Sequence, residues 1–244
     1  MLIWLTVACA LLLGIISLIA GKFRFLDAIP RSRWLSMAGG VAVAYVFVHL
    51  IPELSHHQET VTGLGYEIRF LSTHTVYLIA LFGLVIFYGL ERAAKNSRRK
   101  QQSIHHEDAA SPQVFLLHMI SFTIYNAIIG YLLVHREVPG VRSLLLFTLA
   151  MGLHFFTNDY GLRQDFKGRY HQYGRWILAM AVLLGWAVGI LTTLHPLVVP
   201  ILFAFLSGGV VLNVLKEELP SERQSSFWAF FAGVIGYTLI LLVQ

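Results

Sequence analysis

Long apolar segments separated by short polar ones make up most of the chain. A helix needs roughly 20 apolar residues to cross the hydrocarbon core of a bilayer, and eight segments approach that length. Strands of a membrane barrel would be about 10 residues long and would alternate apolar and polar positions, which these segments do not. The pattern predicts an all-α, polytopic membrane protein in which residues 1–244 form a single transmembrane domain. The eight predicted spans are residues 1–20, 34–54, 70–90, 114–134, 141–160, 176–194, 197–215 and 227–243.

The composition agrees with a lipid environment. Hydrophobic residues make up 57% of the 244 residues and charged residues only 13%, whereas a soluble domain carries about 25% charged residues. This difference excludes an ordinary cytosolic globule and a disordered chain. The single cysteine, Cys9, excludes a disulfide framework and a zinc site made of cysteines.

The basic residues are divided unequally between the two sets of loops. Of the 18 Lys and Arg residues, 15 lie after spans one, three and five and around spans seven to eight, and only Arg69, Arg136 and Arg142 lie opposite. The positive-inside rule then predicts an integral membrane protein with both termini outside the cytoplasm. Because these charges mark topology, we expect the lipid bilayer as a partner and no nucleic acid. The short chain favours a prokaryotic inner membrane, and the oligomeric state stays open between a monomer and a homodimer.

The longest polar segment, residues 91–111, lies in the cytoplasm by this count. Its high charge and low hydrophobicity are typical of a chain that does not fold by itself, so we expect a flexible cytoplasmic loop. His105 and His106 lie in this loop and are candidates to receive an ion on the inner side.

Two segments of similar sequence run in opposite directions through the predicted bundle. Gly39–Val41 precede His49–Glu53 in span two, and Gly208–Val210 precede Lys216–Pro220 in span seven. Inverted repeats of this kind are typical of secondary transporters. The alternative is that pairs of small residues and prolines at helix ends are simply common in membrane helices.

Histidine and glutamate side chains gather at the outer end of span two. His49 and Glu53 are four residues apart and therefore share one helical face. His56 and His57 follow directly. Imidazole and carboxylate groups bind divalent cations, so these four residues are candidates to collect an ion at the outer mouth. The alternative is a hydrated loop with incidental histidines.

Polar side chains interrupt the apolar sequences of spans four and five. Thr123 and Asn126 share a face of span four, and His154 and Asn158 share a face of span five beside Asp159. Ionisable groups at depth cost several kcal/mol unless they are paired or hydrated, so we expect one polar site between the two helices. The alternative is that each group hydrogen-bonds separately across helices. The candidate metal ligands are His118, Thr123, Asn126, His154, Asn158 and Asp159.

These features resemble the ZIP family of divalent-metal transporters. The resemblance rests on His49–Glu53, on Gly208–Pro220 and on Phe231–Tyr237, together with the eight spans and the histidine-bearing loop after span three. It implies a ZIP-like 3+2+3 arrangement of helices with inverted repeats. It also implies zinc or another divalent metal as the substrate, no organic cofactor and no enzymatic activity.

The resemblance places the family's transport site at Phe122–Ala127 of span four and His154–Asp159 of span five. This chain departs from the family pattern, because Asn126 and Asn158 stand where the family has glutamates. A divalent cation that leaves water needs anionic oxygen to offset its lost hydration, so two amides weaken such a site. The His154 and Asp159 side chains, helped by His118, are the groups left to hold one metal ion.

Three functions therefore stay open. The first is a ZIP-like transporter that moves a divalent cation into the cytoplasm by alternating access, with spans two and seven rocking against the group that contains spans four and five. The second is a transport-inactive ZIP-like membrane sensor or interaction protein, which the neutralised site favours. The third is a zinc-dependent intramembrane hydrolase built from His49, His118, His154 and Asp159, although their spacing matches no established zinc motif.

Overall fold

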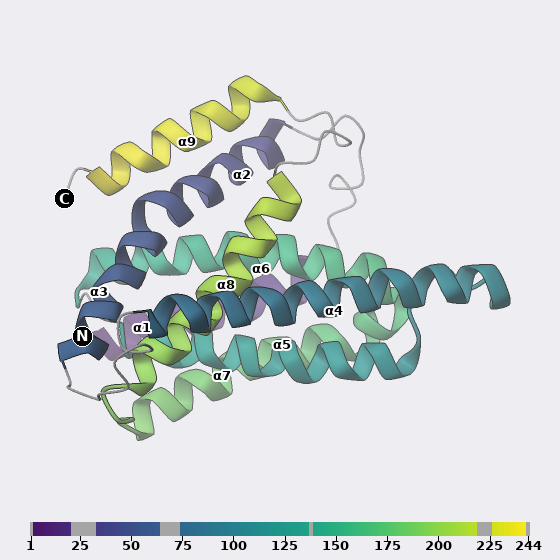
Figure 1. Ribbon diagram of the computed structural model, residues 1–244, viewed down its shortest axis with the longest axis horizontal. Helices are drawn as coiled ribbons and strands as arrows, with labels where there is room; N and C mark the ends of the chain where they lie inside the picture. The colour runs from purple at the N-terminus through teal and green to yellow at the C-terminus, as the bar shows by residue number, and fades with distance from the viewer. Residues whose placement is uncertain (1, 21–32, 64–73, 137–138, 219–225, 243–244) are drawn as a thin grey trace. The chain divides into compact units, whose positions relative to one another are not determined.

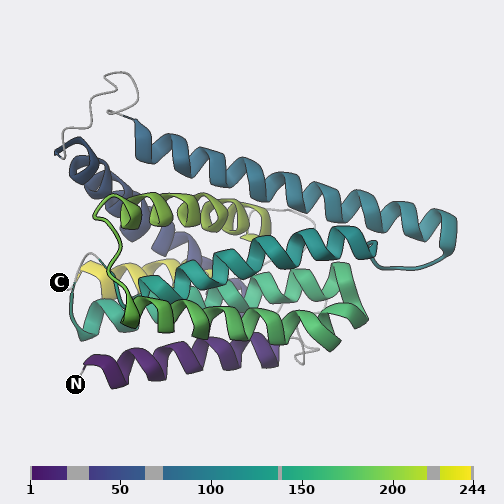
Figure 2. The ribbon, with the colours of Figure 1, turned by 90° about the horizontal axis from the view of Figure 1, so that it is seen from below.

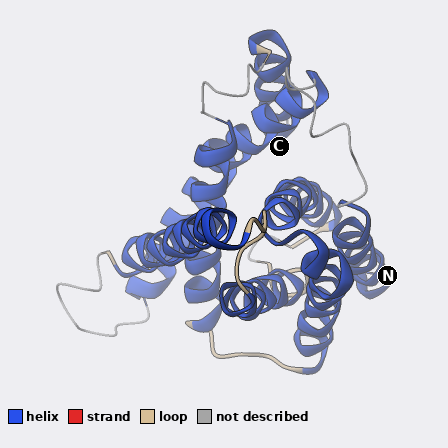
Figure 3. Ribbon diagram, turned by 90° about the vertical axis from the view of Figure 1, so that its right-hand side faces the viewer, coloured by secondary structure: helices blue, strands red, loops and turns tan. Residues whose placement is uncertain are grey.

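The computed structural model describes residues 2–20, 33–63, 74–136, 139–218 and 226–242. Within these residues the backbone forms helices joined by short connections, without strands (Figures 1 and 3). The elements in chain order are α1 (Leu2–Ile19), α2 (Arg33–Tyr45), the π-helical turn η3 (Val46–Leu50), α3 (Ile51–Gly63), α4 (Thr75–His105), α5 (Pro112–Leu132), α6 (Val141–Arg169), the π-helical turn η4 (Tyr170–Gly174), α7 (Arg175–Leu191), α8 (Val198–Glu218) and α9 (Phe227–Leu242).

Several of these helices are long and apolar enough to cross a membrane, which confirms the predicted all-α class and membrane type. In the described part of the chain, five continuous stretches meet this criterion, and α1 and α9 are shorter apolar helices. The stretches are Ser36–Gly63, Thr75–Ile104, Pro112–Leu132, Val141–Leu191 and Val198–Lys216. The 51-residue stretch Val141–Leu191 contains predicted spans five and six, which are joined through η4.

Two compact units make up the fold, whereas the sequence pattern predicts a single domain. The first unit comprises residues 1–22 and 86–194, and the second comprises residues 23–85 and 195–244. In the first unit, α7 packs against both α5 and α1, and α1 also packs against α6 (Figure 2). In the second unit, α2 packs along α9, and α8 contacts both α2 and α3.

Glycines allow the backbones of α5 and α7 to touch. A Cβ atom at Gly130 of α5 would lie 2.1 Å from the carbonyl oxygen of Val182, and one at Gly185 of α7 would lie 2.0 Å from that of Ala127. No side chain fits at these distances, so both positions require glycine. Lipid tails are as apolar as leucine, and membrane helices therefore associate through close packing of small residues.

In the second unit, glycines allow close contact between helix backbones at two places. Between α2 and α9, Cβ atoms at Gly40 and Gly233 would lie 2.0 and 2.1 Å from carbonyl oxygens of the facing helix. Between α4 and α8, the corresponding distances at Gly83 and Gly208 are 2.3 and 1.9 Å. Gly40 and Gly208 belong to the two segments of the predicted repeat, and each lies where its helix is closest to a neighbour. The inverted repeat itself stays a prediction.

Helix α4 continues far beyond the predicted end of span three. Residues 91–105, which were expected to belong to a flexible loop, are helical, and this corrects the expectation. Glu91 and Lys95 form an i,i+4 ion pair of 3.0 Å, and the segment is rich in Ala, Arg, Lys and Gln, all good helix formers. The charges therefore end the apolar part of the helix and not the helix itself.

Predicted span two also continues, through η3 and α3 to Gly63. Pro52 lies inside this helix, where a proline removes one backbone donor and clashes with the carbonyl group four residues earlier. The π-helical turn Val46–Leu50 ends just before Pro52, and such turns relieve clashes of this kind. His56 and His57 consequently lie on a helix and not in a hydrated loop.

The glycine contact between α2 and α9 predicts a position-dependent effect of one methyl group. Gly233→Ala would force the two backbones apart and lower stability by about 1–3 kcal/mol, the usual cost of overpacking. Gly236→Ala on the same helix is the matched control, because a Cβ atom there meets no atom within 4 Å. Thermal unfolding of the purified protein in detergent measures both. Equal midpoints for the two variants would contradict the contact.

Candidate functional site

Helices α5 and α6 share a buried polar pair. The hydroxyl group of Tyr125 lies 2.8 Å from Nε2 of His154, in hydrogen-bond contact. Tyr125 is 1% exposed and His154 is 7% exposed, so the imidazole of span five lies inside the first unit. The expectation that the two helices present polar groups to each other holds for His154, but its partner is Tyr125 and not Asn126.

Aromatic rings surround the hydroxyl–imidazole contact. Phe87 of α4 meets the Tyr125 ring edge-on at a centroid distance of 5.0 Å, and Phe122 lies 6.0 Å from it. Sequence reasoning missed Tyr125 because a tyrosine in an apolar helix reads as a core residue. The available signal was its hydroxyl group, which needs a hydrogen-bond partner when the ring is buried.

Asn126 connects α5 to a different helix. Its side-chain amide donates a hydrogen bond of 3.2 Å to the carbonyl oxygen of Leu178 in α7. The residue is 1% exposed, and its Oδ1 atom has no hydrogen-bond partner. Asn126 therefore contributes to the α5–α7 contact, whereas His154 bonds to Tyr125.

The other candidate ligands of spans four and five are spread out. His118 is buried, contacts the carbonyl oxygen of Val114 through Nδ1 at 2.9 Å, and packs against the Phe166 ring at 4.9 Å. Thr123 and Asn158 are half-buried on α5 and α6. Among the residues that the structure describes, no three His, Cys, Asp or Glu side chains lie close enough to hold one metal ion. Their role as metal ligands stays a prediction.

Asp159 of α6 has partners that sequence reasoning did not identify. It is 1% exposed, and its carboxyl group interacts with the hydroxyl groups of Ser17 on α1 and Tyr170 on η4. Asp159 and His154 have different partners because five residues on a helix of 3.6 residues per turn separate side chains by about 140°. No local pattern connects Ser17 with Asp159, since they lie on helices far apart in the sequence.

The candidate residues of the outer mouth separate into three environments. His49 and Glu53 form the expected i,i+4 pair, with Nε2 and Oε2 3.2 Å apart. His56 is exposed and pairs with Glu59 at 3.7 Å. His57 is 2% exposed and packs against the Phe203 ring of α8 at a centroid distance of 4.6 Å. The expected i,i+4 pairing is therefore present for His49 and Glu53.

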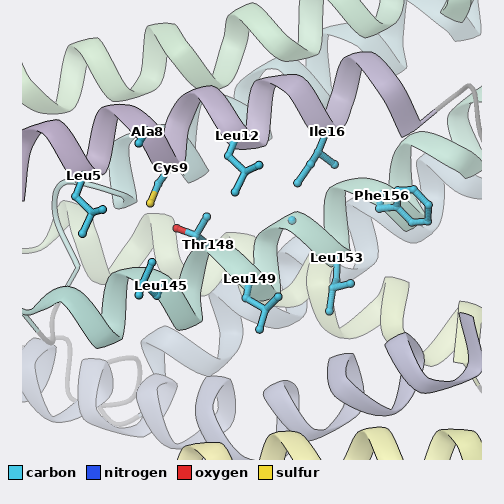
Figure 4. A pocket seen from close by; sticks show the side chains of 11 residues that line it. Leu5, Ala8, Cys9, Leu12, Ile16, Leu145, Thr148, Leu149, Leu153 and Phe156 are labelled. Atoms are coloured by element: carbon cyan, nitrogen blue, oxygen red, sulfur yellow. The ribbon is translucent and has the colours of Figure 1, made fainter. Parts of the chain in front are cut away.

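A cavity of about 550 Å³ lies between α1 and α6 (Figure 4). Its lining is almost wholly apolar, with Cys9 and Thr148 as the exceptions. The Thr148 hydroxyl donates to the carbonyl oxygen of Leu144 in its own helix at 2.7 Å. The cavity consequently offers no free polar group to an ion or a polar ligand.

The connection between α4 and α5 is tied down by ion pairs. Arg98 of α4 donates to Asp108 at 2.6 Å, and Lys167 of α6 pairs with the same carboxylate. Arg169 donates to the carbonyl oxygen of Ala110 at 2.8 Å. We call the ion pairs of Asp108 with Arg98 and Lys167 the Asp108 clamp.

The Asp108 clamp corrects the expectation of a flexible loop over residues 106–111. His105 ends α4, and His106 is exposed with a left-handed backbone conformation, φ = 55°. Lys167 also has a positive φ of 42°, at the junction of α6 and η4. The clamp therefore holds a backbone conformation that L-residues adopt rarely.

No protein-family model, curated protein or solved structure matches the chain. The fold and the site define an all-helical protein with helices of membrane-spanning length that buries polar side chains between the helices of its first unit.

The Tyr125–His154 pair predicts a cost for removing one hydroxyl group. Tyr125→Phe leaves Nε2 of His154 without this partner in a buried site, which should lower stability by about 1–3 kcal/mol. Tyr88→Phe is the control, because that tyrosine lies on the surface of α4, 49% exposed. Thermal unfolding in detergent compares them. An unchanged midpoint for Tyr125→Phe would show that the contact contributes nothing.

The Asp108 clamp predicts a specific pH dependence. The hydrogen bond from Arg98, with help from Lys167, holds the pKa of Asp108 well below its usual range. The clamp's contribution to stability is therefore complete above the pKa of a free aspartate, about 3.9, and is lost only as the pH falls through the lower folded value. Between pH 8 and 5, hydrogen-exchange protection factors for residues 106–111 should stay constant.

Asp108→Asn should reduce these protection factors throughout that pH range, because the ion pairs are lost. Glu107→Gln is the matched control at the neighbouring exposed position. Protection in Asp108→Asn equal to that in the wild type would show that the clamp does not order this connection.

Proposed function

We propose that the protein is a ZIP-like transmembrane transporter that crosses the membrane eight times and carries a cation inward by alternating access. The observation that supports this is the division of the chain into two helical units. Predicted spans two and seven (α2–α3 and α8) fall in one unit, and spans four and five (α5 and α6) fall in the other. In many transporters one helical bundle rocks against another around the substrate site.

The chain passes between the two units in ways that suit such a motion. Residues 192–197 form a short non-helical connection at one unit boundary. Rigid units with few covalent connections can exchange between two arrangements as bodies. In the proposed cycle the unit with α2 and α8 moves relative to the unit with α5 and α6.

The proposed path has its midpoint at the buried polar groups of the first unit, His154 and Asp159. His49 and Glu53 collect the cation on the outer side, the region of His154 and Asp159 forms the midpoint, and His105 and His106 receive it inside. The substrate is zinc or another divalent metal, as the family resemblance implies. Transport needs sites weak enough to release their ion, and a midpoint with one buried carboxylate and neutral amides meets this need.

A second candidate is the transport-inactive membrane sensor or interaction protein. The hydrogen bonds of His154 to Tyr125 and of Asn126 to the Leu178 carbonyl group favour it. Groups that are occupied within the protein are not available as ligands unless these bonds break. In this case the ZIP-like layout would remain without a flux of ions.

Metal uptake distinguishes the two candidates. Cells that express the protein should accumulate zinc, iron, manganese or cobalt above cells that lack it, and His154→Ala or Asp159→Ala should reduce uptake to background. Thr148→Val on the same helix should leave uptake unchanged, because its hydroxyl is bound within α6. If the folded, membrane-inserted wild type shows no uptake of any of the four metals, the sensor replaces the transporter.

A further inference from the structure

Three buried oxygen atoms from three elements of the first unit lie together. They are Oγ of Ser17 on α1, Oδ2 of Asp159 on α6 and the hydroxyl of Tyr170 on η4, and their residues are 0%, 1% and 1% exposed. The Asp159 carboxyl group lies close enough to both hydroxyl groups to interact with them. Within the described residues, however, none of the three atoms makes a contact with the distance and angles of a full hydrogen bond. Buried polar atoms are almost always satisfied in folded proteins, so three unsatisfied oxygens at one place point to a ligand.

Packing fixes Ser17 and Asp159 in place. Gly152 of α6 allows α1 to come close, with Cδ1 of Ile16 only 3.1 Å from the position of a Cβ atom. Asp159 lies seven residues after Gly152 and thus on the same face of α6. Ser17 directly follows Ile16 and reaches Asp159. The α1–α6 contact therefore determines the position of two of the oxygens.

Packing also fixes Tyr170. A Cβ atom at Gly174 would lie 2.7 Å from the Tyr170 ring, so glycine is needed there. The ring belongs to a hydrophobic cluster with Met119, Phe166 and Leu178. A ring held on several sides leaves its hydroxyl group little freedom to turn away. The three oxygens therefore form a preorganised site and not a chance approach of mobile side chains.

The chemistry of the group indicates a singly charged, hard cation. All three ligand atoms are oxygens, which suit alkali and alkaline-earth cations, whereas zinc and other softer metals prefer nitrogen and sulfur. Asp159 supplies one negative charge, and an uncompensated buried charge is costly. One carboxylate balances one positive charge, while a divalent ion would leave a net charge in the low-dielectric interior.

We propose that Ser17, Asp159 and Tyr170 form a binding site for a monovalent alkali cation of the sodium class. As a coupling ion it would tie α1, α6 and η4 together in one state of the transport cycle, and this role rests on the proposed function. The binding itself does not depend on transport. Secondary transporters hold their coupling ions in sites of this kind between helices.

Two arginines limit the affinity of the site. Arg163 and Arg175 act electrostatically on Tyr170. Their guanidinium groups lie over the rings of Tyr160 and Trp176, at 5.2 and 5.5 Å. Their positive charge weakens the binding of a cation at the site. A weak site exchanges its ion readily, as a coupling ion requires.

Thermal unfolding of the full chain in detergent tests the proposal. Sodium chloride is titrated against choline chloride at constant ionic strength and constant pH, with lithium and potassium in parallel. The wild type should show a saturable rise of its unfolding midpoint with an alkali cation, because a ligand that binds only the folded state stabilises it. Ser17→Ala and Asp159→Asn should abolish the rise. Ser207→Ala is the matched control, since that buried serine donates to the Phe203 carbonyl oxygen in its own helix.

Two outcomes would overturn the site. One is a wild-type midpoint that does not change with any alkali cation, including a midpoint that follows pH alone. The other is a rise that persists in both Ser17→Ala and Asp159→Asn. Should Asp159→Asn fail to fold, Ser17→Ala and Tyr170→Phe decide, together with retention of radioactive sodium by the purified wild type.

The same experiments separate the site from the proposed function. A sodium-dependent midpoint in a protein without metal uptake would keep the site and refute the transporter. Metal uptake without any alkali-cation effect on the midpoint would keep the transporter and refute the site.

Discussion

Contact between helix backbones at glycine is the constraint on which the structure depends. In lipid the hydrophobic effect does not drive helices together, because a leucine meets the same environment on a tail as on a neighbouring helix. What remains is close packing, and it requires positions without a side chain. Gly130 and Gly185 provide this between α5 and α7, and Gly40 and Gly233 provide it between α2 and α9. Each such contact lies within one of the two units, so glycine packing holds each unit together as one body. The polar groups then lie among the side chains that each unit encloses.

Tightly packed helices also determine which polar groups meet. Once α5 and α7 are in contact, Asn126 lies next to the Leu178 carbonyl group and bonds there instead of turning toward α6. Once α1 lies along α6 at Gly152, Ser17 lies beside Asp159. The hydroxyl group of Tyr125 is then the hydrogen-bond partner of His154. Interhelical hydrogen bonds in membranes are individually modest, about 0.6–2 kcal/mol, so they follow the packing and do not direct it. Glycine packing therefore determines which polar groups become neighbours in the first unit.

The sequence predicts the class of fold well and the partners poorly, for one physical reason. Hydrophobic length and helical spacing are local, so the apolar helices and the His49–Glu53 pair could be found by reading along the chain. The continuation of α4 to His105 was missed because charge was taken as the end of a helix, although Glu91 and Lys95 stabilise it. Tertiary partners carry no local signal. Ser17 with Asp159, and Lys167 with Asp108, are distant in sequence and become neighbours only when α1 and the connection between α4 and α5 meet α6.

The electrostatics of the first unit follow from what surrounds Asp159. At the positions where the resemblance would place glutamates, Asn126 and Asn158 bring no charge, and Asn126 already donates to a backbone carbonyl group. Asp159 instead faces two neutral hydroxyl groups from α1 and η4. A site with one negative charge and neutral oxygens stabilises one positive charge at low cost, and each additional charge has to be taken out of water without compensation. Because the two asparagines are neutral, Asp159 alone sets the negative charge of this group. This favours a cation of a single positive charge at the place where α1, α6 and η4 meet.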